Sequence, residues 1–507
     1  MEADQTSDEI LSLVDTACLR IEDRTSLIVN VGAMVFAQPL DLERVKEILG
    51  RRFLAFPRFR QRVVFPGLPL GTPHWEDDSL FDLGSHLHRI ALPPPGDDRA
   101  LGEVLSDLTS TPLDRAIPLW QVHLIENYGD GCVLLFRLHH CLADGMALLR
   151  VLRAITDRNP ETPRTVPATA RRPPRDEDRL QAVVQLLTAG VHSLLGGTEV
   201  MLHKAAEALL HPDQGRDLAQ TAAGAATTLG RLLLMEPDSA TVFKGPLGVA
   251  KRVAWSAPLV IREVKAVGRC FGASVNEVLL TTVTGALRRY LQHRGEPVSG
   301  VHLRASIPVN LRHDESSPGL GNRFSLNLLA LPVDRGDPVE RLDVLRQRLR
   351  DLKGSSAAEV VFGLMNLYGL APTEVGNLVI HLLGNKVTAV LSSVPGPPRL
   401  TYFAGQPIRR MIFWVPQSGR LGLGLSLLTY QGSVTLGVVS DAGLVPDPGA
   451  IVQGFQDEWE QFLKTLPPAA RAPASSGDIT GGRSRRRKRK SSAGEPRPPI
   501  VPTEKHR

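Results

Sequence analysis

Cysteine is scarce in this sequence, which argues against cysteine-based metal sites and a disulfide framework. Four of the 507 residues are cysteines: Cys18, Cys132, Cys141 and Cys270. They are scattered and lack the close spacing of a metal site, so we expect no bound metal. They also form no disulfide framework, which favours a reducing cytoplasm. Cys141 follows two histidines and is a candidate nucleophile. A small packed residue is the favoured interpretation, because the histidines already supply a base.

Long apolar runs are also missing. The most apolar stretch, residues 183–195, contains Gln185 and His192 and is too short and too polar to cross a bilayer. The first nine residues are acidic and polar, so we expect no secretory signal there. We therefore expect a cytoplasmic protein whose contact with a membrane or lipid body is at most peripheral.

Excess basic charge is confined to one end of the chain. The formal net charge is +6, but residues 468–507 hold 11 of the 59 Lys and Arg residues and 3 of the 53 Asp and Glu residues. That end has a net charge of +8, so the rest of the chain carries −2. Its composition predicts a disordered tail around Arg485–Lys490, which could bind anionic lipid or nucleic acid. No nucleic-acid partner is expected for the body.

The chemistry is concentrated in one stretch, Arg137-Leu-His-His-Cys-Leu-Ala-Asp-Gly-Met146. An apolar segment before it predicts a buried strand, and apolar residues at helical spacing after it predict a helix. The histidines and Asp144 therefore fall in a strand-to-helix turn. His140 is the side chain best suited to take a proton near neutral pH. Asp144 could orient it, pair with a buried cation, or cap the helix, and Gly145 permits a sharp turn.

The full pattern, His139-His140-x-x-x-Asp144-Gly145 after a strand, resembles the active-site motif of the wax ester synthase/diacylglycerol acyltransferase family, within the CoA-dependent acyltransferase superfamily. The resemblance implies that His140 is the general base. It implies that His139 lines the site or holds His140, and that Asp144 is structural. It also suggests an arginine partner for Asp144 from the other half of the chain, with Arg312 as the best candidate.

Other stretches resemble the same family: Pro57–Arg60, Pro118-Leu-Trp120, Asn276-Glu277, Ser306–Arg312 and Leu320-Gly-Asn-Arg-Phe324. Trp120 and Asn276 are candidates for substrate contacts. A tryptophan that anchors the core is the favoured interpretation of Trp120. Asn276 lies in the first turn of a predicted helix, where it is equally well explained as a cap residue. The family has Asp where this chain has Glu277, which forms a capping box with Ser274 and leaves a specific role for the acid in doubt.

The resemblance covers roughly residues 8–465 and implies an α/β (α+β) fold. It implies two chloramphenicol-acetyltransferase-like domains with mixed sheets around a central cleft or tunnel. We expect an N-terminal acyltransferase domain (1–156), a linker with inserted helices (157–245), a C-terminal acyltransferase domain (246–467) and the basic tail (468–507). The helices within 183–235 are interpreted as packing helices or as a membrane-surface patch.

The function implied is acyl transfer from a fatty acyl-CoA to a lipid hydroxyl, giving triacylglycerol from diacylglycerol or wax ester from a long-chain alcohol. No cofactor is implied beyond acyl-CoA as substrate. One alternative is a condensation-type or polyketide-associated enzyme with the H-x-x-x-D motif, which would use an acyl-carrier thioester. Another is an inactive lipid-binding protein, although the intact His140, Asp144 and Gly145 count against it.

Overall fold

The computed structural model describes residues 9–66, 72–160, 234–311, 320–353, 357–370 and 384–466, together with Gly230, Leu232 and Ile380. Arg312, the tail and most of the predicted helices within 183–235 lie outside these residues. The predicted division into domains at residues 157 and 246 stays a prediction.

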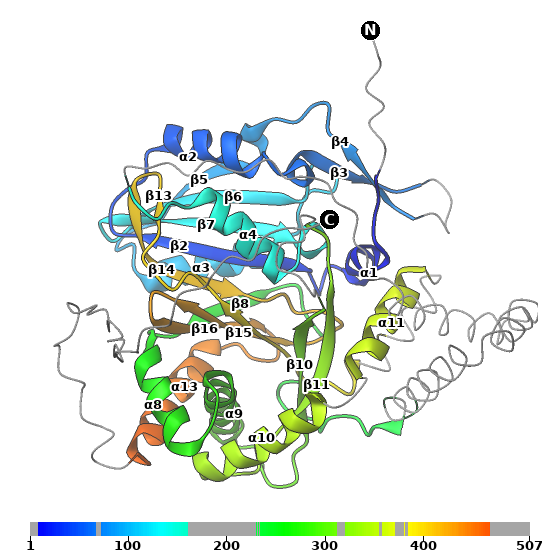
Figure 1. Cartoon of the computed structure of the whole chain (residues 1–507), viewed down its shortest axis with the longest axis vertical. Helices are drawn as coiled ribbons and strands as arrows, with labels where there is room; N and C mark the ends of the chain where they lie inside the picture. Colours follow the sequence, from blue (N-terminus) through cyan, green and yellow to red (C-terminus); the bar gives the residue numbers. More distant parts are fainter. Residues whose placement is uncertain are drawn as a thin grey trace, which may run out of the picture. The chain divides into compact units, whose positions relative to one another are not determined.

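The first half of the chain supplies most of a six-stranded sheet. Its order is β13-β14-β2-β7-β6-β5, with β5 and β6 parallel and the other neighbours antiparallel. The strands are β2 (Val29–Phe36), β5 (Leu87–Ala91), β6 (Trp120–Tyr128), β7 (Gly131–His139), β13 (Tyr402–Phe403) and β14 (Gln406–Trp414). Strands β13 and β14 come from the second half of the chain and extend this sheet beyond β2 (Figure 1). A small sheet of β1 (Glu9–Ile10), β4 (His74–Asp77) and β3 (Gln61–Val64) lies apart from it.

The helices of the first half are amphipathic and carry side-chain caps. They are α1 (Leu13–Ile21), α2 (Leu42–Ile48), α3 (Asp98–Ser110) and α4 (Gly145–Ile155). Ser12, Asp41, Asp97 and Asp144 cap them, each accepting a hydrogen bond from a backbone N–H of the first turn. Such a cap stabilises a helix by about 1 kcal/mol.

The second half forms a mixed sheet of order β11-β10-β12-β15-β16-β8, with β9 paired to β16. Its strands are β8 (Lys251–Trp255), β9 (Leu259–Val260), β10 (Leu303–Asn310), β11 (Phe324–Leu331), β12 (Ala389–Pro395), β15 (Leu423–Tyr430) and β16 (Ser433–Asp441). Strand β12 runs parallel to both β10 and β15. Strands β15 and β16 form a hairpin, and Gln431 and Gly432 turn between them at positive φ.

The helices of the second half are α8 (Ile261–Phe271), α9 (Val275–His293), α10 (Pro338–Lys353), α11 (Ala357–Leu370) and α13 (Pro448–Lys464). The predicted capping box between Ser274 and Glu277 is present at the start of α9. Helix α11 packs against α1, which belongs to the first half. Gly369 permits this approach, because a Cβ there would overlap the carbonyl oxygen of Leu13. The mixed α/β architecture predicted from the resemblance is confirmed.

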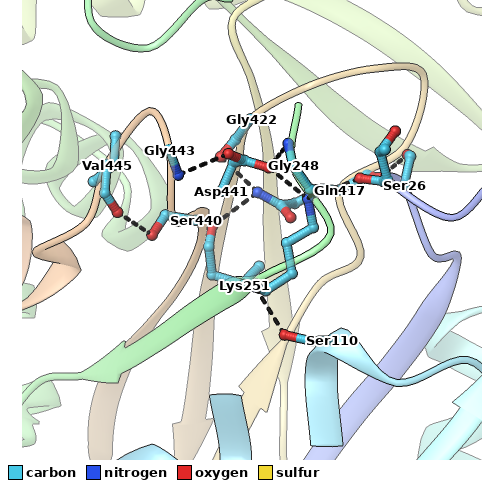
Figure 2. A network of polar contacts seen from close by, with 12 residues as sticks. Ser26, Ser110, Gly248, Lys251, Gln417, Gly422, Ser440, Asp441, Gly443 and Val445 are labelled. Atoms are coloured by element: carbon cyan, nitrogen blue, oxygen red, sulfur yellow. Dashed lines mark hydrogen bonds and ion pairs between the residues drawn. The ribbon is translucent and has the colours of Figure 1, made fainter. Parts of the chain in front are cut away.

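A buried polar network also joins the two halves of the chain (Figure 2). Lys251 Nζ donates to Asp441 Oδ2 at 2.7 Å and to the Thr25 carbonyl oxygen at 2.7 Å. The backbone N–H of Lys251 donates to Ser110 Oγ at 2.8 Å. Thr25 and Ser110 belong to the first half, so a single lysine connects segments more than 100 residues apart.

Candidate active site

The histidine motif occupies the junction between β7 and α4. Strand β7 ends at His139, His140–Leu142 form one 3₁₀ turn, and α4 begins at Gly145. Strand β7 is buried along its whole length and pairs with β2 and β6, so the turn stands on the rigid centre of a sheet. The predicted strand-to-helix turn is confirmed.

His139 points into a buried polar cluster. Its Nδ1 accepts the backbone N–H of Cys141 at 3.1 Å, so the ring proton belongs on Nε2. Nε2 lies 3.1 Å from Glu22 Oε2. Burial alone would raise the pKa of Glu22, but its contact with His139 and the hydrogen bonds that it accepts from the Ile28 N–H and from Arg115 lower it to about 2. Glu22 is thus a carboxylate at neutral pH and fixes the orientation of His139.

His140 is oriented by a residue from the opposite half of the chain. Its Nδ1 lies 3.1 Å from Asn322 Oδ1. The Nδ2 group of Asn322 donates to the His140 carbonyl oxygen at 2.7 Å and to Asp15 Oδ1 at 2.6 Å. Both of those partners are acceptors, so Nδ2 must be the amide nitrogen and Oδ1 must face His140. Nδ1 of His140 therefore carries the proton, and Nε2 holds the free lone pair.

Burial sets the protonation states along this chain of hydrogen bonds. It lowers the pKa of His140 below the usual range, although the nearby Asp144 carboxylate acts in the opposite direction. Burial raises the pKa of Asp15, against the hydrogen bonds that it accepts from Ser12 and Asn322. A neutral His140 that can accept a proton at Nε2 is thus favoured near neutral pH.

Asp144 joins the motif to the loop that carries Asn322. Its Oδ1 accepts the N–H of Ala147 at 2.8 Å and caps α4, while its Oδ2 accepts the N–H of Arg323 at 3.1 Å. The side chain is buried. Asp144 therefore holds together two segments that meet at His140. The proposed partner Arg312 lies outside the described residues.

His140 lines an apolar cavity of about 1150 Å³, here called the His140 cavity. Its walls come from both halves of the chain. Cys18, Ile21 and Ile28 belong to the first half, whereas α11, β10, β11 and the segment 415–421 supply most of the remaining wall. Leucine, valine, methionine and phenylalanine side chains dominate the lining, which suits a hydrocarbon chain.

Two further polar groups belong to the lining of the His140 cavity. Ser306 Oγ and Tyr368 Oη are buried and have no hydrogen-bond partner among the described residues. Either hydroxyl could bond a polar group of a ligand. Cys18 and Cys141 are poor nucleophiles, because burial raises the pKa of both thiols well above the usual thiol range.

The other predicted substrate residues lie apart from this cavity's lining. Trp120 is fully buried, donates from Nε1 to the Phe59 carbonyl oxygen at 2.8 Å and stacks on His86. That geometry agrees with a core anchor. Asn276 is exposed in the first turn of α9. Among the described residues, no cluster of His, Cys, Asp or Glu could hold a metal ion.

Sequence reasoning missed Asp15, Glu22 and Tyr368 as parts of the site. Ser306 and Asn322 stood in stretches singled out for their resemblance, Ser306–Arg312 and Leu320–Phe324, but neither residue carried an assigned role. The available signals were weak: Ser12 and Asp15 have the spacing of a helix start, and Asn322 follows a glycine in a loop. Neither pattern indicates contact with His140.

Comparison with known proteins identifies the family. Residues 11–279 match the wax ester synthase/diacylglycerol acyltransferase catalytic domain, and residues 320–462 match the C-terminal domain of the same family. A probable diacylglycerol O-acyltransferase, tgs1, of Mycobacterium tuberculosis is 30% identical over 455 residues, covering 88% of this chain and 94% of that protein. A putative diacylglycerol O-acyltransferase of Mycobacterium bovis, Mb3154c, matches to the same extent.

Solved structures share the fold. The wax ester synthase/diacylglycerol acyltransferase of Marinobacter aquaeolei VT8 is 21% identical and has a TM-score of 0.62. The superposition covers 90% of this chain and 98% of that one. A condensation domain of the calcium-dependent antibiotic synthetase is 16% identical with a TM-score of 0.54, covering 93% of this chain and 98% of that one. From the sequence matches, this chain belongs to the wax ester synthase/diacylglycerol acyltransferase family and is an acyltransferase.

Proposed function

We propose that this acyltransferase moves a fatty acyl group from acyl-CoA to a lipid hydroxyl, with His140 as general base. Diacylglycerol is the main acceptor and gives triacylglycerol, and long-chain alcohols give wax esters. The observation that carries the proposal is the hydrogen bond from His140 Nδ1 to Asn322 Oδ1. It leaves the basic nitrogen of His140 free beside a cavity lined mostly by apolar side chains.

The reaction is a direct transfer. His140 Nε2 removes the proton of the acceptor hydroxyl as its oxygen attacks the thioester carbonyl carbon. A C–O bond forms, the C–S bond breaks, and the proton passes from His140 to the leaving thiolate. The products are an ester and free CoA. General base catalysis of this kind contributes about 10²- to 10⁴-fold.

The neighbouring residues support this step. His139, held by Glu22, fixes the end of β7, and Asp144 fixes the start of α4. Gly145 stands at the first position of that helix, whose N-terminal end is positive and favours the negative charge of the tetrahedral intermediate. Ser306 Oγ, from its place in the wall of the His140 cavity, can bond the acceptor.

Fatty acyl-CoA, diacylglycerol and long-chain alcohols are the partners that follow from this chemistry. The protein works in the cytoplasm and meets its lipid acceptor at a membrane surface or lipid body. No metal or bound cofactor takes part, because a histidine base and a thioester suffice for the transfer.

The test is to incubate the purified protein with radiolabelled palmitoyl-CoA and a panel of acceptors, then to separate the lipid products. We expect labelled triacylglycerol from diacylglycerol, a smaller yield of wax ester from hexadecanol, and stoichiometric release of CoA. His140→Ala is the matched inactive control. Transfer from a palmitoyl acyl-carrier thioester but not from palmitoyl-CoA would support a condensation-type enzyme instead. Lipid binding without any transfer would identify a lipid-binding protein.

A further inference from the structure

Helix α11 brings a buried hydroxyl group into the apolar wall of the His140 cavity. Tyr368 is 4% exposed and lines the cavity, and its Oη has no hydrogen-bond partner among the described residues. Burial raises the pKa of Tyr368, so the phenol keeps its proton at neutral pH and can donate a hydrogen bond. A buried donor without an acceptor is costly. A ligand that places an acceptor atom at this point removes the cost, whereas a pure hydrocarbon chain does not.

The residues of α11 that line the cavity follow strand β11. They form one stripe of about 10 Å at 1.5 Å per residue, made of Val361, Leu364, Met365 and Tyr368. Leu328 on β11 packs against the apolar cluster that contains Val361, the first residue of the stripe. Four residues earlier on β11, about 13 Å away at 3.3 Å per residue, the Phe324 ring lies 5.1 Å from the His140 ring. The stripe therefore starts at the end of the cavity that is remote from His140.

The contacts of the next residue place Tyr368, the last of the stripe, at the catalytic end. Gly369 approaches the start of α1 so closely that a Cβ on it would lie 2.1 Å from the Leu13 carbonyl oxygen. Two residues further along α1, Asp15 accepts a hydrogen bond from Asn322, the residue that orients the catalytic base. Tyr368 therefore joins the cavity wall at the end where the hydroxyl of the acceptor must meet that base.

We propose that Tyr368 selects diacylglycerol as the acceptor, by donating a hydrogen bond from Oη to an ester carbonyl oxygen of the bound lipid. The inference rests on the proposed function, in which His140 Nε2 takes the proton of the acceptor hydroxyl. An ester on the adjacent glycerol carbon places its carbonyl oxygen only a few bonds from that hydroxyl, and so at the end of the cavity that holds Tyr368. A long-chain alcohol has no such oxygen and leaves the buried phenol unpaired, which makes it the poorer acceptor.

The experiment removes the hydroxyl from the protein and the carbonyl oxygens from the ligand, separately and together. Tyr368→Phe keeps the aromatic ring, and the dioctyl ether analogue of dioctanoylglycerol keeps the glycerol, its free hydroxyl and both chains. In isothermal titration calorimetry, the wild type should bind the diester about 5- to 10-fold more tightly than the diether, as expected for one hydrogen bond. Tyr368→Phe should raise the Kd of the diester by the same factor and leave the Kd of the diether within about 2-fold, so that the preference disappears.

The rates of acyl transfer should follow the same pattern. With palmitoyl-CoA as donor, Tyr368→Phe should lower kcat/KM for dioctanoylglycerol about 5- to 10-fold and leave kcat/KM for hexadecanol within about 2-fold. Tyr430→Phe is the matched control. Tyr430 is 5% exposed, donates from Oη to the Ile408 carbonyl oxygen at 2.8 Å and does not line the His140 cavity. This variant should keep the wild-type preference for the diester over both the diether and hexadecanol.

Three results would overturn the inference. The wild type could bind the diester and the diether equally, a comparison that needs no variant. The preference for the diester could survive Tyr368→Phe. Tyr368→Phe could also lower kcat/KM equally for dioctanoylglycerol and hexadecanol, which would show that Tyr368 acts on the donor or only through packing. Failure of the proposed function looks different: the wild type would transfer no acyl group from any acyl-CoA, whereas the Kd values of the diester and the diether still test Tyr368.

Discussion

At His140, one hydrogen bond decides which nitrogen can act as a base. Asn322 accepts the Nδ1 proton, so Nε2 is the basic atom. We expect His140→Ala to lower kcat by about 10²- to 10⁴-fold. The melting temperature should stay nearly unchanged, because the ring is only half-buried and its loss enlarges an existing cavity instead of creating a hole in the packed core. His139→Ala should cost less activity. Steady-state rates and melting curves decide between them. An inactive His139→Ala beside an active His140→Ala would reverse the assignment.

Asn322 is a positioning residue for the same step. Asn322→Ala removes the acceptor for His140 Nδ1, so either ring nitrogen of His140 can then carry the proton. We therefore expect kcat to fall on the order of 10²-fold, with little change in the KM of either substrate. Asn366→Ala, which removes a buried amide bonded to the Phe362 carbonyl oxygen on α11, is the control for lost packing. Equal effects of the two substitutions on kcat would show that Asn322 acts only through stability.

The pH profile should follow the lowered pKa of His140. Burial favours the neutral imidazole, and only that form can accept the proton. The acid limb of kcat/KM should therefore lie below the ordinary histidine value of about 6.5, with activity rising as pH increases through it and level near neutrality. A limb at or above the ordinary value would argue against His140 as the group that titrates.

At the scale of single elements, the sequence predicts interactions between residues a few positions apart, but it does not predict which distant strands pair. The capping box of α9 depends on Ser274 and Glu277, which are three positions apart, so the sequence predicted it. Strand β14 pairs with β2, nearly 380 residues earlier in the chain, and no local pattern indicates such a partner. The same limit explains the site. The spacing predicted the turn that holds His140, whereas Asn322 and Asp15 reach it from remote segments.

The start of α4 should depend on Asp144 through more than its cap. Asp144→Asn weakens the bonds to Ala147 and Arg323 and, if Arg312 is the predicted partner, leaves that cation unpaired. Asp144→Asn and Arg312→Met should each lower stability by a buried-pair penalty on the order of 3–5 kcal/mol and reduce activity. The double variant should lose less than the sum. Strict additivity in urea unfolding would show that the two residues do not meet.

The network around Lys251 should stabilise the junction of the two halves without serving catalysis. Lys251→Met leaves the buried Asp441 carboxylate without its cation, which should cost about 3–5 kcal/mol. At a temperature where the variant is folded, kcat should be close to wild type, because the network contacts neither His140 nor Asn322 in any described hydrogen bond. Lys46→Met breaks an exposed pair with Glu43 and should cost about 0–1 kcal/mol. Equal losses in urea unfolding would mean that the Lys251 pair contributes little.

At the scale of the whole molecule, the question is how an apolar site meets a lipid acceptor. Among the described residues, no single helix is long and apolar enough to cross a bilayer. Helices α8 and α9 taken together have the length and the apolar composition of a membrane span, but they are bent by 98° relative to each other. The concentrated charge of the chain lies instead at residues 468–507, which carry a net +8 while the remainder carries −2. Contact with an anionic surface is therefore expected of that segment.

Truncation after Leu466 tests whether residues 467–507 bind a lipid surface while the rest of the chain carries out acyl transfer. The described site and the His140 cavity lie within residues 9–466, so the truncated protein should keep its turnover on short, soluble alcohols within about 2-fold. If the segment binds anionic lipid, its six consecutive basic residues, Arg485–Lys490, contribute about 1 kcal/mol each near a charged surface. Truncation should then weaken co-sedimentation of the protein with phosphatidylglycerol vesicles and slow acyl transfer to diacylglycerol in those vesicles. With vesicles of phosphatidylcholine alone, truncation should change neither the binding nor the transfer rate. Replacing Arg485–Lys490 with serine in the full-length chain should reproduce both effects. A large loss of turnover on soluble alcohols after truncation would show instead that residues 467–507 belong to the catalytic unit.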